Sequence, residues 1–310
     1  MAVTHGKELD VVVCLAAGAS RSLRRATVLD PFPRACLDAQ GEPDFDGCRA
    51  ALESLPTVRE IAQSLVGEAG AAADGATLSD EQGQLVRALM DLKGVRIMAP
   101  DARATHKYSI RATDRPPEAP AVVLQLDHGD DPEFQATCDA YGSVEAFHGS
   151  ALENFHCILR CGLKSFSGNR ERMRTGDIFG EGVYMSSELP LARSFAPRAL
   201  APPTSELGAF LSCVAICQVA LHPSVRRKKE TAQLGGAQGR PIHSFPHTYY
   251  VAPDASHIRV IGLLIFADGT APPRETAPLL QNGVRGWMRL WWRLVLCMLV
   301  LLALHFLWGR

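Results

Sequence analysis

The chain has 310 residues, of which 47% are hydrophobic and 21% charged, and its formal net charge is -1. This composition excludes a wholly disordered chain and a collagen-like fibre, and the balanced charge gives no electrostatic footprint for nucleic acid. Nine scattered cysteines are an odd number, which argues for reduced thiols in a cytosolic compartment.

The first 93 residues predict a small all-helical domain. Apolar spacing and helix-boundary signals predict four helices, over residues 7–29, 44–55, 56–66 and 79–93. Leu15 and Ala19 lie at helical spacing in the first, which is expected to continue unbroken until Pro31 approaches. Ser79 with Gln82 three residues later is a capping-box pattern that marks the start of the last.

Residues 94–278 change in character, because short apolar runs there alternate with turn residues, which is typical of strands. The strands that this pattern predicts cover residues 95–98, 121–126, 145–148, 182–186, 209–219, 248–252 and 258–267. Only two short helices are expected among them, over residues 153–161 and 189–195. This order predicts an α+β domain. The basic run at 226–229 is interpreted as a solvated hairpin tip, with a membrane or partner contact as the alternative.

Residues 279–310 combine a linker with the most apolar part of the chain. A helix over 287–308 would reach roughly 33 Å at about 1.5 Å per residue, which is enough for a hydrocarbon core of about 30 Å. Trp287 and Trp308 stand at its two ends, as interfacial aromatic residues do. Arginines such as Arg289 on its N-terminal side predict a single-span, tail-anchored protein with its bulk in the cytosol. A buried core helix is the alternative.

The cysteine pairs do not predict a metal site. Cys157 and Cys161 are expected on a helix, and Cys213 and Cys217 on a strand. Three residues separate each pair, whereas the usual zinc knuckle has two. The sequence also has no GxGxxG, P-loop, HExxH or GxSxG motif, so the chemistry must come from other residues.

Three short motifs are the candidates for that chemistry. Phe147–Ser150 reads FHGS and ends a predicted strand, Phe179–Ser186 contains GVY, and Thr248–Val251 precedes the last predicted strand. Together they resemble the catalytic domain of the diphtheria-toxin-like ADP-ribosyltransferases, the poly(ADP-ribose) polymerase family, whose H-G-[ST], G-x-Y and third-strand motifs come in this order. The resemblance implies an ADP-ribosyltransferase fold of split antiparallel sheets, with NAD⁺ as co-substrate and no metal.

The resemblance also implies roles for individual residues. Cleavage of the nicotinamide–ribose bond passes through an oxocarbenium-like state and releases a neutral leaving group, so positioning matters more than an acid. His148 would hydrogen-bond a ribose hydroxyl, while the Gly149 backbone and the Ser150 hydroxyl would pair with the carboxamide. Tyr184 would offer a flat face to the nicotinamide ring. Phe195 aligns with a second stacking aromatic, with ordinary core packing as the alternative.

The third motif bears on the product. Polymer-forming members of the family carry Glu at its key position, whereas this chain has Tyr249, with Tyr250 as the neighbouring register. Strand alternation allows only one of the two to face the site. A phenol with an ordinary pKa of about 10 is a poor base at neutral pH. We therefore expect His148, Tyr184 and Tyr249 to catalyse transfer of single ADP-ribose units to protein side chains.

Within the family, the chain most resembles a tail-anchored mono-ADP-ribosyltransferase of the endoplasmic reticulum. That likeness implies a catalytic domain on the cytosolic face, a role in the unfolded-protein response, and acceptors among stress-sensor kinases and a nuclear import receptor. It also implies that the helical domain, residues 1–93, regulates turnover. A catalytically inactive NAD-binding membrane scaffold and an adaptor that acts through the helical domain are the alternatives.

Overall fold

The computed structural model describes residues 6–67, 78–92, 94–98, 104–111, 118–164, 179–227 and 246–269. Its N-terminal part is helical, as expected. The helices there are α1 (Gly6–Ser20), α2 (Arg25–Val28), α3 (Phe45–Glu53), α4 (Val58–Gly67) and α5 (Asp80–Met90), with a 3-10 turn at Arg34–Cys36. The capping box predicted for Ser79 and Gln82 is present at the start of α5.

The single helix expected over residues 7–29 is wrong, because the structure breaks it into α1 and α2. Two serines satisfy backbone groups at the break. The Ser20 hydroxyl donates to the carbonyl of Ala17, and the Ser22 hydroxyl accepts from the backbone N–H of Arg24. Short hydroxyl side chains compete with the helical hydrogen bonds in this way, and the apolar spacing alone did not reveal it.

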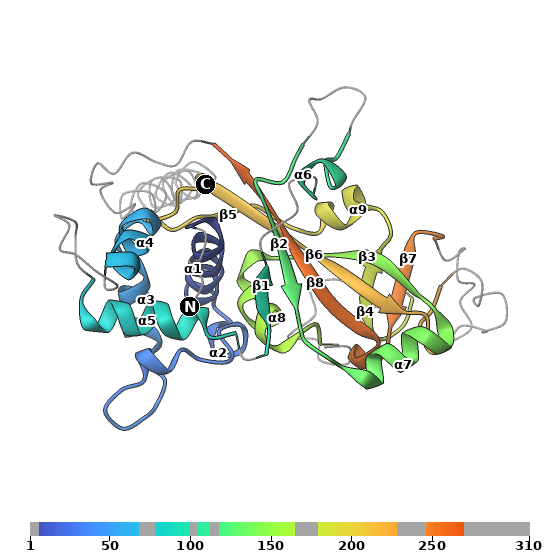
Figure 1. Ribbon diagram of the computed structural model, residues 1–310, viewed down its shortest axis with the longest axis horizontal. Helices are drawn as coiled ribbons and strands as arrows, with labels where there is room; N and C mark the ends of the chain where they lie inside the picture. Colours follow the sequence, from blue (N-terminus) through green and yellow to red (C-terminus); the bar gives the residue numbers. More distant parts are fainter. Residues whose placement is uncertain are drawn as a thin grey trace, which may run out of the picture. The chain divides into compact units, whose positions relative to one another are not determined.

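All the named strands pair antiparallel. They are β1 (Arg96–Met98), β2 (Val122–Asp127), β3 (Ser143–Ser150), β4 (Val183–Ser186), β5 (Ala199–Leu200), β6 (Phe210–Ala220), β7 (Tyr249–Ala252) and β8 (Ile258–Asp268). Their order is β1-β2-β8-β6-β3-β4-β7, with β5 on β6, so β8 runs between β2 and β6 (Figure 1). The seven predicted strands are confirmed, and the two-residue β5 was missed.

The resemblance implied two split sheets, whereas the described strands are joined into one path by a narrow contact between β3 and β4. β3 and β4 share only one residue pair, Phe147 with Ser186, whereas β3 pairs with β6 along its whole length. The strands therefore form one continuous path with a narrow junction between β3 and β4. The motif residues of β3, β4 and β7 lie on either side of this junction.

In the described ranges, four helices accompany these strands. They are α6 (Ala104–Lys107), α7 (Pro132–Tyr141), α8 (Phe155–Cys161), which a 3-10 turn at Leu152–Asn154 precedes, and α9 (Leu189–Ser194). The last two were predicted, whereas α6 and α7 were not. The start of α7 carries a readable signal, because Asp131 caps the backbone N–H of Phe134 and Pro132 stands at the first position.

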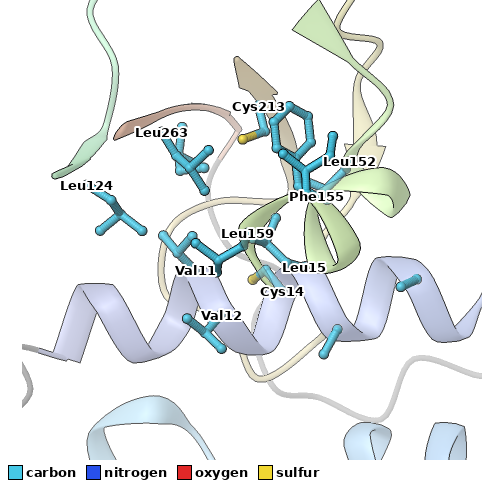
Figure 2. Close-up of a cluster of buried hydrophobic side chains, with 14 of the residues drawn as sticks. Val11, Val12, Cys14, Leu15, Leu124, Leu152, Phe155, Leu159, Cys213 and Leu263 are labelled. Carbon is cyan, nitrogen blue, oxygen red and sulfur yellow. The ribbon is translucent and has the colours of Figure 1, made fainter. Parts of the chain in front are cut away.

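The helical part and the sheet share one hydrophobic core. α1 is buried along most of its length, and its Val11 and Leu15 point toward Leu159 of α8, below Leu152 and Phe155 (Figure 2). α8 follows the FHGS strand after the 3-10 turn at Leu152–Asn154, so α1 supports the segment next to the first motif.

Two expectations concern the cysteines and the membrane. The eight cysteines in the described ranges are free thiols, as the sequence predicted. The expected span at 287–308 lies outside the described residues. Among the helices that the structure does describe, none has the length and apolar character needed to cross a bilayer.

Candidate functional site

His148 stands near the end of β3 with one ring nitrogen held by the protein. Its Nδ1 lies 2.8 Å from the carbonyl oxygen of Tyr184, and because a carbonyl only accepts, Nδ1 carries the proton. Burial lowers the pKa of this imidazole, partly offset by that backbone hydrogen bond, so the ring is neutral at physiological pH. Its Nε2 is therefore an acceptor, suited to a hydroxyl donor.

Gly149 permits a close contact with the helix behind it. A Cβ built on this residue would lie 1.7 Å from the carbonyl oxygen of Ala192 in α9 and 3.3 Å from the Cβ of Phe195. No side chain fits without moving the α9 backbone. From the sequence, Gly149 is expected to let a ligand approach the backbone. The structure shows that the close packing of α9 against this residue also requires a glycine.

Phe195 follows the last residue of α9 and is 44% exposed. The alternative that it serves as an ordinary core residue is therefore wrong. Because its Cβ approaches Gly149, the ring starts beside the FHGS segment. An exposed aromatic ring at that place can stack on a planar ligand.

Tyr184 is fixed by the loop that precedes it. Its hydroxyl donates to the carbonyl of Gly180 at 2.7 Å and accepts from the backbone N–H of Phe179 at 3.0 Å. The Arg226 guanidinium donates to the carbonyls of Phe179 and Glu181, at 2.7 Å and 2.9 Å. The interpretation of Arg226 as part of a solvated tip is thus wrong, since it braces the loop that holds Tyr184.

The register of β4 and β7 decides between the two neighbouring tyrosines. Tyr184 pairs with Val251, so Tyr249, two residues earlier, lies on the face of Tyr184. The Tyr249 ring lies 5.8 Å from the ring of Phe179, which in turn lies 6.5 Å from that of Tyr184. Tyr250 pairs with Met185 and packs on the main core instead.

Ser150, the last residue of β3, is held from the side opposite the sheet. Its Oγ accepts from Asn154 Nδ2 at 2.7 Å, and Asn154 Oδ1 accepts from Arg24 Nη2 at 2.9 Å. The same Nη2 lies 2.6 Å from a carboxylate oxygen of Glu153. This chain of contacts joins the motif to the helical part of the molecule.

Five of the six residues singled out from the sequence lie on β3, β4 and β7, and Phe195, after α9, adjoins them at Gly149. His148 bonds the backbone of Tyr184, Gly149 abuts Phe195, Tyr184 and Tyr249 share a face, and Ser150 adjoins Gly149. Sequence reasoning missed Asn154, Phe179 and Arg226 as supporting residues. Only the spacing of Asn154, four residues after Ser150, could have drawn attention to it.

One cluster in the described ranges has metal-ligand chemistry. Ligand atoms of Asp30, Cys157 and Cys161 all lie within 4.8 Å of one another. It contains none of the six site residues. Burial raises the pKa of the Cys157 thiol to about 11, so that this sulfur is protonated at neutral pH and a poor ligand in that form.

The arrangement defines a class of protein. The site offers a neutral imidazole acceptor, a hydroxyl beside a glycine backbone, and aromatic rings on β4, on β7 and after α9. Such groups suit a ligand with ribose hydroxyls and an aromatic carboxamide. These are the groups of the nicotinamide half of NAD⁺. The fold and the site are those of an ADP-ribosyltransferase.

Comparison with known proteins agrees. The family model described as the poly(ADP-ribose) polymerase catalytic domain matches residues 121–251, and the one described as the ARTD15 N-terminal domain matches residues 6–90. The human protein named protein mono-ADP-ribosyltransferase PARP16 (Homo sapiens) is 30% identical over 307 residues, covering 95% of this chain and 88% of that protein.

The mouse protein of the same name (Mus musculus) is 29% identical over 324 residues, covering 97% of this chain and 93% of its own. Mouse protein mono-ADP-ribosyltransferase PARP8 is 25% identical over 194 residues, 59% of this chain and 21% of that protein. The chain belongs to the poly(ADP-ribose) polymerase family and is an NAD⁺-dependent ADP-ribosyltransferase.

Proposed function

We propose that this chain transfers single ADP-ribose units from NAD⁺ to protein side chains, on itself and on partner proteins. The observation that carries the proposal is the position of Tyr249 on the face of Tyr184, where polymer-forming relatives are expected to have Glu. A neutral phenol cannot take a proton from an acceptor hydroxyl as a carboxylate can. The relatives named mono-ADP-ribosyltransferase support the same product.

Each site residue has a part in this reaction. His148 Nε2 accepts a hydrogen bond from a ribose hydroxyl, Gly149 and Ser150 hold the carboxamide, and Tyr184 and Phe195 contact the nicotinamide ring. The bond from the ribose C1′ to the pyridinium nitrogen breaks, and nicotinamide leaves neutral with the electron pair. The acceptor side chain then bonds to C1′, and any proton that it carries passes to solvent. Tyr249 borders the acceptor side of the site.

The proposal includes a cellular location. The apolar residues 287–308, with arginines on their N-terminal side, support a tail anchor with the catalytic residues on the cytosolic face of the endoplasmic reticulum. The likeness to a tail-anchored member supports a role in the unfolded-protein response, with stress-sensor kinases and a nuclear import receptor as acceptors. No nucleic acid partner is proposed, since the net charge is only -1.

The test is the intact mass of the full chain after incubation with NAD⁺. Mass steps of one ADP-ribose per acceptor, absent in His148→Ala, would support the proposal. Branched or chain-like multiples on a single acceptor would overturn the mono-transfer product. Folded wild-type protein that binds NAD⁺ but forms no product, even with candidate acceptors present, would favour the inactive scaffold instead.

A further inference from the structure

Two cysteines of α8 lie on one face of that helix. Cys157 and Cys161 are four positions apart, which is the spacing that makes two side chains neighbours on a helix surface. The two histidines of an HExxH motif bind one zinc ion with this spacing. Cys213 and Cys217 have the same spacing on β6, but there it separates the residues by about 13 Å. The spacing therefore forms a chelating pair on α8 and not on β6.

A third donor reaches this pair from the helical part of the molecule. Asp30 comes shortly after α2, and α2 packs beside α8 (Figure 1). A carboxylate oxygen of Asp30 and the two Sγ atoms of Cys157 and Cys161 all lie within 4.8 Å of one another. Three points this close lie no more than about 2.8 Å from a common centre, because 4.8 Å divided by √3 is 2.8 Å. Zinc bonds of about 2.0–2.3 Å then need side-chain shifts of only roughly 0.5–0.8 Å.

The backbone next to Asp30 is already attached to α8. The carbonyl of Pro31 accepts a hydrogen bond from Nε2 of His156 at 3.1 Å, and His156 immediately precedes Cys157. The Asp30 side chain is exposed and the two cysteines are half-buried. An ion can therefore enter from solvent, and the carboxylate can turn toward it without movement of the backbone.

The charges around the cluster suit a divalent cation with an affinity for sulfur. Two thiolates and a carboxylate carry three negative charges, of which Zn²⁺ offsets two. Arg160 interacts electrostatically with both cysteines, and Lys164 with Cys157, so cations are at hand for the third. Thiolate ligands select zinc over magnesium and calcium, which prefer oxygen. Burial raises the pKa of the Cys157 thiol, and a metal ion that binds there displaces its proton.

We propose that Asp30, Cys157 and Cys161 bind one zinc ion, with water in the fourth tetrahedral position. Binding releases two thiol protons to solvent and joins the segment after α2 to α8. None of the six residues of the NAD⁺ site takes part, so the inference is independent of the proposed function. With only three protein ligands the ion is exchangeable, and its occupancy follows the zinc concentration. Because it binds the folded chain, zinc raises the Tm.

The experiment uses the full chain in detergent, kept reduced by a phosphine and stripped of metal. Cobalt(II) is the spectroscopic probe, because thiolate ligands give it a charge-transfer band and tetrahedral coordination gives it visible bands. We expect one equivalent of cobalt per chain, displaced by one equivalent of zinc. The Tm should rise by about 5 °C at a free zinc concentration 100 times the Kd.

Four variants assign the ligands. Cys157→Ser and Cys161→Ser should each raise the Kd for zinc at least about 100-fold, the effect of losing one of a few strong ligands. Asp30→Asn keeps an oxygen but loses its charge, and should raise the Kd about tenfold. Cys213→Ala is the matched control, since this cysteine has the same spacing on a strand, and the Kd for zinc should not change.

Wild-type protein without a cobalt charge-transfer band and without a zinc-dependent rise in Tm would overturn the inference. Wild-type zinc affinity in both serine variants would also overturn it, because the ion would then be bound elsewhere. Asp30→Asn with wild-type affinity would overturn the assignment of the third ligand. Self-modification with NAD⁺, compared with His148→Ala, tests the proposed function separately, so failure of either one leaves the other in place.

Discussion

Two histidines eight residues apart illustrate the difference between the motif strand and the helix that follows it. His148, on β3, uses one nitrogen for the carbonyl of Tyr184. His156, on α8, uses both: Nε2 donates to the carbonyl of Pro31 at 3.1 Å, and Nδ1 accepts from Arg160 at 3.2 Å. Burial lowers the pKa of each ring, so both are neutral at pH 7.

Their hydrogen bonds distinguish a histidine that can bind a ligand from one that only supports the fold. A neutral ring with both nitrogens satisfied inside the protein has no capacity left for a ligand, and its contacts join α8 to the helical part. A ring with one nitrogen engaged keeps the other as an acceptor. His148 is prominent in the sequence because Gly149 and Ser150 follow it. His156 also stands among apolar residues, but both of its ring nitrogens are already hydrogen-bonded within the protein.

The largest expected effect is the loss of ADP-ribosyltransferase activity when His148 on β3 is replaced. His148→Ala should reduce self-modification at least about 100-fold, because the ribose loses its positioning contact, while the free energy of unfolding falls by no more than about 1 kcal/mol. His156→Gln should behave in the opposite way, with reduced stability and near-normal turnover. Intact mass measures self-modification, and urea unfolding measures the free energy of unfolding. His148→Ala with more than a tenth of wild-type activity would contradict the assignment.

The next largest effect is expected on the free energy of unfolding when Arg160 is replaced. Its guanidinium donates to the carbonyl of Leu89 in α5 and to His156, and burial lowers its pKa to about 10, so it stays charged at neutral pH. Arg160→Met leaves these acceptors without a donor and should cost about 2–3 kcal/mol. Arg49→Met is the control, because Arg49 forms an exposed pair with Glu53, and its loss should cost less than about 0.5 kcal/mol. Equal urea midpoints for the two variants would argue against the assigned role of Arg160.

Gly149→Ala should affect both properties. The added methyl would clash with the Ala192 carbonyl, so α9 must shift, and we expect a cost of about 1–3 kcal/mol together with lost activity. Gly18→Ala in α1 is the control. Its added methyl would meet Leu152 at 3.6 Å, an ordinary contact, and helical glycine to alanine stabilises by about 0.5–1 kcal/mol. The measurements are the Tm of each glycine variant and its rate of self-modification at a temperature below that Tm.

At pH 7 the last effect is absent, because it is a dependence of stability on acid pH that belongs to α8. The pKa of His156 is about 3 in the folded chain, mainly because of burial, against about 6.5 when unfolded. Below pH 6.5 the unfolded state binds the extra proton, so stability is full above that value and falls as the pH drops. By pH 5 the loss is roughly 2 kcal/mol, at 1.36 kcal/mol per unit.

His156→Gln should remove most of this slope, because glutamine does not titrate. Urea unfolding at several pH values between 7 and 5 would show it. A variant with the wild-type slope would mean that other groups, including His148, determine the acid sensitivity.

The sequence could predict the motif residues because each lies in a short, contiguous pattern at a strand end. It could predict the capping of α5 for the same reason, since Ser79 and Gln82 act over three residues. It placed the β-strands well but joined α1 to α2, where the serine hydroxyls compete with the helix. These successes and errors all concern local chemistry.

Contacts between distant residues could be decided only by the tertiary structure. The choice of Tyr249 over Tyr250 required the register of β4 against β7, because alternation fixes the relative faces but not which face is the site. The brace from Arg226 to the loop before Tyr184 joins residues far apart in the chain.

The sequence by itself thus determined the class of chemistry, because His148, Gly149, Ser150 and Tyr184 carry it through their own functional groups and near neighbours. The tertiary structure decided what holds those groups in place. Arg24 reaches Asn154 across 130 positions in the chain, and such a contact leaves no periodic pattern to read. Hydrogen-bond direction, burial and strand register are properties of the folded chain, and they determine which atoms remain for the substrate.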